Sequence, residues 1–282
     1  MFSSKVGDKK TLKVDDHKGS GPAPKRVPNP GSLDEEVSFM DIIREGRPKH
    51  KKAGKESNNA QNTEAQTQNK CAMSIHSAFK GNSYRITIDS PKKRNAISYA
   101  MYEAMCAALD EAYENEETFI TVVTGQGDFY SSGHDQTDPK SPMFDVSAKR
   151  DTDASFSRWI KRLIEHKKIL VALVNGPAVG VACASLGLFD YVVCSDSTYI
   201  ITPYVPMGIG PEAASSSTFF SIMGNSRASE MLLFGQPMTA QKALKCGFVG
   251  QIFPKAEFKS RSEDFIERLC KLPRHVSNTV AN

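Results

Sequence analysis

The chain has 282 residues, of which 24% are charged and 39% are hydrophobic, a balance that predicts a folded domain with a sizeable core. Its formal net charge is +4, and residues 1–70 hold this whole excess with 14 Lys and Arg against 10 Asp and Glu. The neutral remainder argues against a nucleic-acid partner, and no apolar run is long enough to span a bilayer. The six cysteines and six histidines lack metal-site spacing, so we expect no metal, and reduced thiols in an intracellular compartment.

Residues 1–72 differ in composition from the rest of the chain. A Pro- and Gly-rich run at 19–31 and a polar run at 55–70 cannot bury enough apolar surface to offset the entropy of ordering. We therefore predict a disordered basic and polar tail over 1–72, followed by one domain over 73–282. Segment 33–46 mixes apolar and acidic residues and is compatible with a docking helix, so the tail is either a solvated linker or a partner-binding element.

The first half of the domain alternates strands and helices. Period-two alternation predicts a strand within 83–91, and helical spacing of apolar residues predicts helices within 96–116 and 155–168. Continuous apolar runs predict buried strands that lead into Gly-containing loops within 119–133 and 169–180.

The second half continues the same pattern. We expect a small-residue helix and then a strand within 181–195, a short strand within 197–203, a helix that opens at Glu212, helices within 226–235 and 239–248, and a strand within 249–254. Repeated strand–loop–helix units predict an α/β fold with right-handed crossovers.

Three loops carry residues suited to binding or catalysis. Loops 128–135 and 175–185 place glycine and small residues where a buried strand ends, and such glycines either make tight turns or let backbone N–H groups face a developing negative charge. Segment 91–98 sets three cations beside a strand end, which is either a solvated face or a site for a phosphorylated ligand.

Glu212 is the one acid in the otherwise uncharged stretch 208–220. A carboxylate at the start of a helix is a common stabilising feature, worth about 0.3–1 kcal/mol. A carboxylate isolated among apolar residues is also suited to act as a general base. The residues alone leave both interpretations open.

Five segments, taken together and in this order, resemble those of the crotonase (enoyl-CoA hydratase/isomerase) superfamily: 91–98, 128–135, 174–196, 202–216 and 228–254. The likeness is greatest to peroxisomal-type Δ3,Δ2-enoyl-CoA isomerases, and next to chromodomain-Y-like proteins. It implies a crotonase-like α/β spiral of ββα units that binds a fatty acyl-CoA thioester.

The resemblance implies an oxyanion hole built from two backbone N–H groups, those of His134 and Val181, which follow Gly133 and Gly180. His134 departs from the Asn or Ala that the family has there. The resemblance further implies that the loop around the first donor lines the substrate and that the cations face the CoA phosphates; the substrate-binding set is Ser131, Ser132, Gly133, Asp135, Lys92, Lys93, Arg94 and Gly180. No cofactor is implied, because CoA is part of the substrate.

The two glutamates that hydratases place around a water correspond here to Ala184 and Tyr204, so the resemblance argues against water addition. Glu212 matches the single glutamate of the isomerases. This match implies that the Glu212 carboxylate moves a proton from C2 to C4 and converts 3-enoyl-CoA to trans-2-enoyl-CoA in fatty acid β-oxidation.

The family continues beyond the point where this chain ends, with helices that close the acyl pocket and support trimers or hexamers. We therefore expect an incomplete C-terminal helical part and, if it were complete, a homotrimer or hexamer. The resemblance implies a peroxisomal location, with the mitochondrion as the alternative. The alternative function is a non-catalytic acyl-CoA-binding or scaffold protein of the chromodomain-Y-like type, with the basic tail as its interaction element.

Overall fold

The computed structural model describes residues 74–139 and 154–273. The predicted tail over 1–72, its segment 33–46 and the last residues of the chain lie outside the described residues. Among the described residues, no helix combines the length and apolarity that crossing a bilayer requires.

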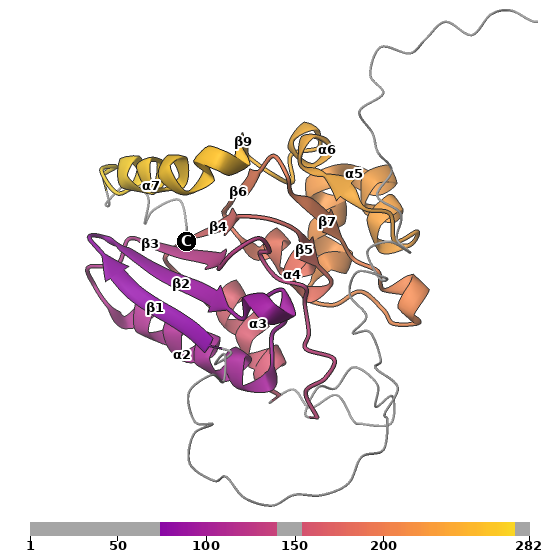
Figure 1. The fold of residues 1–282 in the computed structure, drawn as a ribbon, viewed down its shortest axis with the longest axis horizontal. Helices are drawn as coiled ribbons and strands as arrows, with labels where there is room; N and C mark the ends of the chain where they lie inside the picture. Colours follow the sequence, from indigo (N-terminus) through magenta and orange to yellow (C-terminus); the bar gives the residue numbers. More distant parts are fainter. Residues whose placement is uncertain (1–73, 140–153, 274–282) are drawn as a thin grey trace, which may run out of the picture. The chain divides into compact units, whose positions relative to one another are not determined.

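A six-stranded sheet with the order β1-β2-β3-β4-β6-β9 forms the centre of the fold (Figure 1). Only β1 runs antiparallel to its neighbour; the other strands pair in parallel. Because β3 and β4 are parallel, their carboxyl ends lie at the same end of the sheet, where their glycine-containing loops begin. The strands are β1 (Ser74–Lys80), β2 (Ser83–Asp89), β3 (Ile120–Gly125), β4 (Ile169–Val174), β6 (Tyr191–Ser195) and β9 (Gln251–Phe253).

A smaller sheet holds the loops that follow β3 and β4. It consists of β5 (Ala178–Val179), β7 (Tyr199–Ile201) and β8 (Met238–Thr239), in the order β5-β7-β8. An isolated parallel bridge joins Ser131 to Ala178, and the N–H of Val179 donates to the carbonyl of Ser131 at 3.0 Å. The two loops are thereby held side by side.

Helices cover both faces of the large sheet (Figure 1). On one face, α2 (Tyr99–Glu114) and α3 (Ser155–Glu165) pack against residues such as Ile86 and Val123. On the other, α7 (Phe258–Leu269) packs against Val122 and its neighbours. Adjacent residues of a strand, such as Val122 and Val123, therefore pack on opposite faces of the sheet, because side chains alternate along a strand.

The remaining helices are short or bent. They are η1 (Pro91–Lys93), α4 (Val181–Ala184), η2 (Ser185–Leu188), η3 (Val205–Met207), α5 (Ser215–Leu232), α6 (Ala240–Lys245) and η4 (Lys255–Glu257). Gly224, with φ 74° and ψ 168°, interrupts α5, so the run contains two helical pieces.

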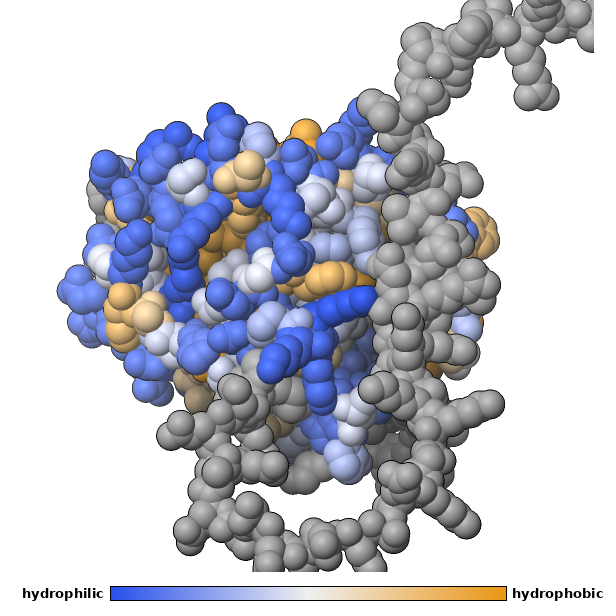
Figure 2. All heavy atoms as spheres, viewed as in Figure 1, coloured by the Kyte–Doolittle hydropathy of each residue, from blue (hydrophilic) through white to orange (hydrophobic). Residues whose placement is uncertain are grey.

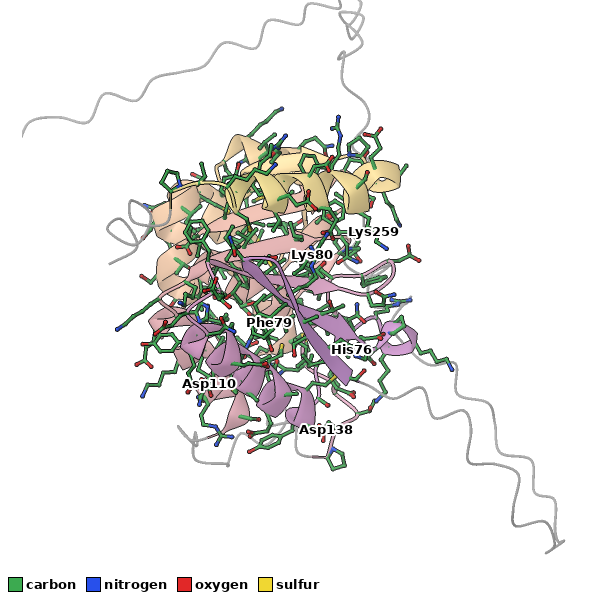
Figure 3. The ribbon with its side chains drawn as sticks, turned by 90° about the vertical axis from the view of Figure 1, so that its left-hand side faces the viewer. His76, Phe79, Lys80, Asp110, Asp138 and Lys259 are labelled. Carbon is green, nitrogen blue, oxygen red and sulfur yellow. The ribbon has the colours of Figure 1, made fainter. Side chains whose placement is uncertain are left out.

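Strand β1 forms one edge of the large sheet, which Figure 3 views with His76, Phe79 and Lys80 labelled on the strand. The ammonium of Lys80 lies 2.8 Å from a carboxylate oxygen of Glu263 on α7. A cation on an edge strand is a common protection against pairing with another chain. The face viewed in Figure 2 is largely hydrophilic, with smaller apolar patches between the polar side chains.

The predicted strands and helices are confirmed, with boundaries that differ by a few residues. The sequence patterns missed β1, the two-residue strands β5 and β8, and α7. The helix expected to open at Glu212 begins at Ser215 instead, so this expectation was wrong. Ala213 and Ala214 have φ values of 50° and 57°, a left-handed conformation that cannot continue into a right-handed helix from Glu212.

Candidate active site

One pocket contains the predicted base and both predicted backbone donors. It has a volume of about 40 Å³. Three loops form it, one after β3, one after β4 and one between β7 and α5. Its lining residues are Ser132, Gly133, His134, Gln136, Val179, Gly180, Val181, Pro203, Tyr204, Met207, Ile209 and Glu212.

Gly133 allows the first two loops to approach each other. Its φ of +87° is a conformation that residues with a β-carbon rarely adopt. A β-carbon at this position would lie 2.7 Å from the carbonyl oxygen of Val179 and 3.6 Å from the backbone nitrogen of Val181. The position therefore requires glycine on two grounds, conformation and space.

His134 and Val181, whose backbone N–H groups are the predicted donors, both line the pocket. Ile97 donates to the carbonyl of Gly133 at 2.8 Å and accepts from the N–H of Asp135 at 2.9 Å, so the N–H of His134 between them points away from Ile97. Among the described residues, nothing accepts a hydrogen bond from the N–H of His134 or of Val181. Such groups can bind an oxygen atom that gains negative charge.

The imidazole of His134 lies between a tyrosine and the predicted base. Its Nδ1 is 3.0 Å from the hydroxyl of Tyr102, and its Nε2 is 3.3 Å from Oε2 of Glu212. Its ring packs edge-to-face on Phe156 with centroids 5.0 Å apart, and only 8% of the side chain is exposed. Burial, aided by the charge of Glu212, holds the pKa of Tyr102 well above its ordinary value, so the phenol keeps its proton.

Glu212 is held in place through its own backbone. Its carbonyl oxygen accepts hydrogen bonds from the N–H and the hydroxyl of Ser215, at 3.0 and 2.7 Å. The two left-handed residues Ala213 and Ala214 then separate it from the first turn of α5. Backbone conformations of this kind cost free energy and occur mainly where the surrounding structure enforces them.

The positions that the resemblance pairs with the hydratase glutamates hold no carboxylate. Ala184 is fully buried in α4, and Tyr204 is buried in the pocket wall. The hydroxyl of Tyr204 makes no hydrogen bond of normal geometry to the described residues, but it interacts with the carboxylate of Glu212. Burial and the nearby charge of Glu212 raise the pKa of Tyr204 far above its ordinary value, so this group stays neutral.

Asp135 and Lys93 form an ion pair behind the pocket. The Lys93 ammonium lies 2.7 Å from the Asp135 carboxylate, which is 3% exposed, and 2.9 Å from the Thr137 hydroxyl. Burial alone would raise the pKa of Asp135, but the hydrogen bonds from Lys93 and Thr137 and the Lys93 charge outweigh it and lower this pKa. The pair joins segment 91–95 to the loop that carries His134.

The other predicted substrate-binding residues fall into two groups. Gly133, Gly180 and Ser132 line the pocket, while buried Ser131 accepts a hydrogen bond from the N–H of Gly133 at 3.1 Å. The cations Lys92, Lys93 and Arg94 do not line it: Lys92 is exposed on η1, and the Arg94 guanidinium lies 5.3 Å from the ring centre of Phe129.

Sequence patterns did not single out several residues of the site. Tyr102 lies on the buried face of α2, where its spacing is that of an ordinary core residue. Met207, Ile209 and Pro203 give the pocket apolar walls. No sequence signal distinguishes these residues from core residues.

Within the described residues, no group of three His, Cys, Asp or Glu side chains is placed to hold a metal ion.

The fold and the pocket define a class of protein. An enoyl-CoA hydratase/isomerase from Pseudoalteromonas atlantica superimposes with a TM-score of 0.67 at 26% sequence identity, over 73% of this chain and 80% of that one. The structure is therefore a crotonase-like α/β fold.

Sequence comparison identifies the family. Residues 78–282 match the model of the enoyl-CoA hydratase/isomerase family, and the chain belongs to this family. Enoyl-CoA delta isomerase 2 of Rattus norvegicus is 41% identical over 69% of this chain and 50% of the rat protein. Peroxisomal enoyl-CoA delta isomerase 3 of Mus musculus is 39% identical over 68% of this chain and 61% of the mouse protein. The chain thus spans about half to three-fifths of the length of these two relatives.

Proposed function

We propose that this protein is an isomerase that moves the double bond of an unsaturated fatty acyl-CoA from C3 to C2. Glu212 takes a proton from C2, which converts the thioester to a dienolate, and returns a proton to C4. The product is the conjugated trans-2-enoyl-CoA, and no atom is gained or lost. The role fits fatty acid β-oxidation, which requires the double bond at C2.

The observation that carries this proposal is the position of Glu212. It is the one carboxylate among the described residues that line the pocket, and it faces the loops that bear the His134 and Val181 N–H groups. A single base that serves two carbons needs no second acid on the opposite face. Positioned general bases contribute about 100- to 10,000-fold to a rate.

The two backbone N–H groups are the proposed oxyanion hole. As the C2 proton leaves, negative charge moves onto the thioester oxygen, where fixed donors stabilise it. Loss of one such donor in other enzymes costs about 3–4 kcal/mol of transition-state stabilisation. Here both donors are backbone groups, so the side chains at 134 and 181 are free to serve other purposes.

Water addition is disfavoured by the same pocket. Hydration needs a second carboxylate to activate water, and the corresponding positions hold Ala184 and a neutral Tyr204. The apolar side chains of Pro203, Met207 and Ile209 in the pocket wall further limit the access of water to the dienolate.

The test is turnover of trans-3-hexenoyl-CoA by the full chain, followed by the ultraviolet absorbance of the conjugated product. Glu212→Gln keeps the size of the side chain and removes the base, so we expect a loss of at least about 100-fold in kcat. Acyl-CoA binding is measured on both samples by calorimetry. Binding without turnover by the wild-type chain would refute the isomerase proposal and support the non-catalytic acyl-CoA-binding alternative.

The name of the mouse relative supports the peroxisome as the proposed location, with the mitochondrion as the alternative. Fractionation of organelles with an antibody to this chain distinguishes the two.

A further inference from the structure

We propose that the side chain of His134 is a positioning residue for Glu212, and that the hydroxyl of Tyr102 holds the imidazole in the orientation that does so. The kinetic consequence rests on the proposed isomerase function, while the arrangement itself can be tested without turnover. A histidine that supplies the oxyanion hole only through its backbone would have no need of these side-chain contacts.

The contacts connect three separate parts of the fold. Tyr102 is on α2, His134 is in the loop after β3, and Glu212 is in the loop before α5. The two hydrogen bonds, 3.0 Å to Tyr102 and 3.3 Å to Glu212, use both ring nitrogens of one imidazole. Phe156 and Tyr102 pack on the ring, so its rotamer is fixed by its neighbours as well as by hydrogen bonds.

The chemistry of the three groups decides the direction of both hydrogen bonds. A carboxylate can only accept, so Nε2 of His134 must carry the proton that it donates to Glu212. In a neutral imidazole Nδ1 then accepts, and the protonated phenol of Tyr102 is its donor. The opposite tautomer would place the Nε2 lone pair against a negative oxygen.

The hydrogen bond from His134 also distinguishes the two oxygens of Glu212. It reaches Oε2, and the carboxylate also interacts with the buried hydroxyl of Tyr204. The carboxylate is thereby held through Oε2. A proton that must be taken from C2 and returned at C4 requires such a fixed orientation, because an error of about 1 Å in position can cost about 100-fold in rate.

The kinetic test compares His134→Ala, His134→Gln and Tyr102→Phe with the wild-type full chain on trans-3-hexenoyl-CoA. Every variant keeps the backbone N–H at 134 and therefore the proposed oxyanion donor. We expect His134→Ala to lower kcat about 10- to 100-fold, with KM changed by less than about threefold. His134→Gln restores an N–H donor and should recover part of the loss, and Tyr102→Phe should fall between wild type and His134→Ala.

Tyr84→Phe is the matched control for Tyr102→Phe. Tyr84 is equally buried and its hydroxyl bonds to the carboxylate of Glu111, away from the pocket. We expect this variant to lose stability without a change in kcat. Equal kcat in wild type and His134→Ala, with both folded, would overturn the proposal.

The second test needs no turnover. Histidine nitrogen NMR of the full chain, at an alkaline pH where imidazoles are neutral, reports which ring nitrogen carries the proton, and His134→Gln assigns the signal. We expect protonation at Nε2 in the wild type and in Tyr102→Phe, because Glu212 remains the acceptor, with a shift of the Nδ1 signal in Tyr102→Phe, which lacks the hydroxyl partner. Protonation at Nδ1 in the wild type would overturn the proposal. If the wild-type chain has no isomerase activity, the proposed function fails and this measurement still decides the role of His134.

Discussion

Gly133 and Val179 come so close that a β-carbon on Gly133 would lie 2.7 Å from the Val179 carbonyl oxygen. The loops that follow β3 and β4 meet at this point, and the two proposed donors lie just beyond it, His134 one residue after Gly133 and Val181 two residues after Val179. The spacing of the two donors therefore depends on the absence of one side chain.

We predict that Gly133→Ala lowers both stability and activity. The methyl group must displace the backbone of Val179, and the left-handed φ of +87° adds strain. We expect a loss of unfolding free energy of more than about 1 kcal/mol and a fall in kcat of at least about tenfold, because the donors move apart. Chemical denaturation and trans-3-hexenoyl-CoA turnover measure the two effects.

Gly81→Ala is the control for this prediction. Gly81 also has a positive φ, of +58°, but a β-carbon there has no atom within 4 Å, so the variant carries the strain without the clash. It should lose about 1 kcal/mol of unfolding free energy and keep the wild-type kcat. Equal kcat in the two variants would show that the approach of the loops does not set the geometry of the donors.

The fold could be predicted where hydrophobic periodicity is strong. The apolar runs around Val122 and Val171 and the amphipathic α3 were recognised because burial fixes their pattern. Strand β1 was missed because it is an exposed edge strand, and β5 because two residues carry no periodicity. The start of α5 was misplaced because two left-handed alanines leave no signal in the sequence, since alanine is normally a helix former.

The site was predictable only in part. Glycines at strand ends and one isolated acid pointed to the loops that meet in the pocket. The side-chain role of His134 was not predictable, since it depends on Tyr102, a residue 32 positions away on another element. Long-range contacts of this kind are fixed by tertiary packing and not by local pattern. The family resemblance implied a backbone donor at 134 but assigned no catalytic role to its imidazole.

We predict that Tyr204→Phe does not destabilise the protein. The hydroxyl makes no hydrogen bond of normal geometry to the described residues, although it interacts with the Glu212 carboxylate; a buried polar group left unsatisfied costs about 1–3 kcal/mol, and the substitution removes it while it keeps the ring. The unfolding free energy should stay constant or rise by about 1 kcal/mol, whereas Tyr84→Phe, which loses a made hydrogen bond, should fall by about 1 kcal/mol. Denaturant titration compares the two. A loss in Tyr204→Phe as large as that in Tyr84→Phe would mean that the hydroxyl is satisfied.

His166, directly after α3, gives the structure a pH-dependent stability that is independent of the pocket. Its Nε2 lies 2.8 Å from the hydroxyl of Thr121. Burial, with a further effect from the charge of Lys168, lowers the pKa of His166 from 6.5 to about 4, although Asp110 acts in the opposite direction. The folded state therefore disfavours the charged imidazole.

Between pH 6.5 and 4 the unfolded chain binds the His166 proton more readily than the folded chain, so the free energy of unfolding falls as the pH drops. The stability that the neutral His166 contributes is fully present above pH 6.5 and is lost below about pH 4. His166→Gln keeps an amide for Thr121 but cannot be protonated. We predict that its free energy of unfolding falls by about 1–3 kcal/mol less than that of the wild type over this pH window. Denaturation of both proteins at a series of pH values gives the difference directly. A difference between the two proteins that stays constant with pH would show that His166 is readily protonated in the folded state.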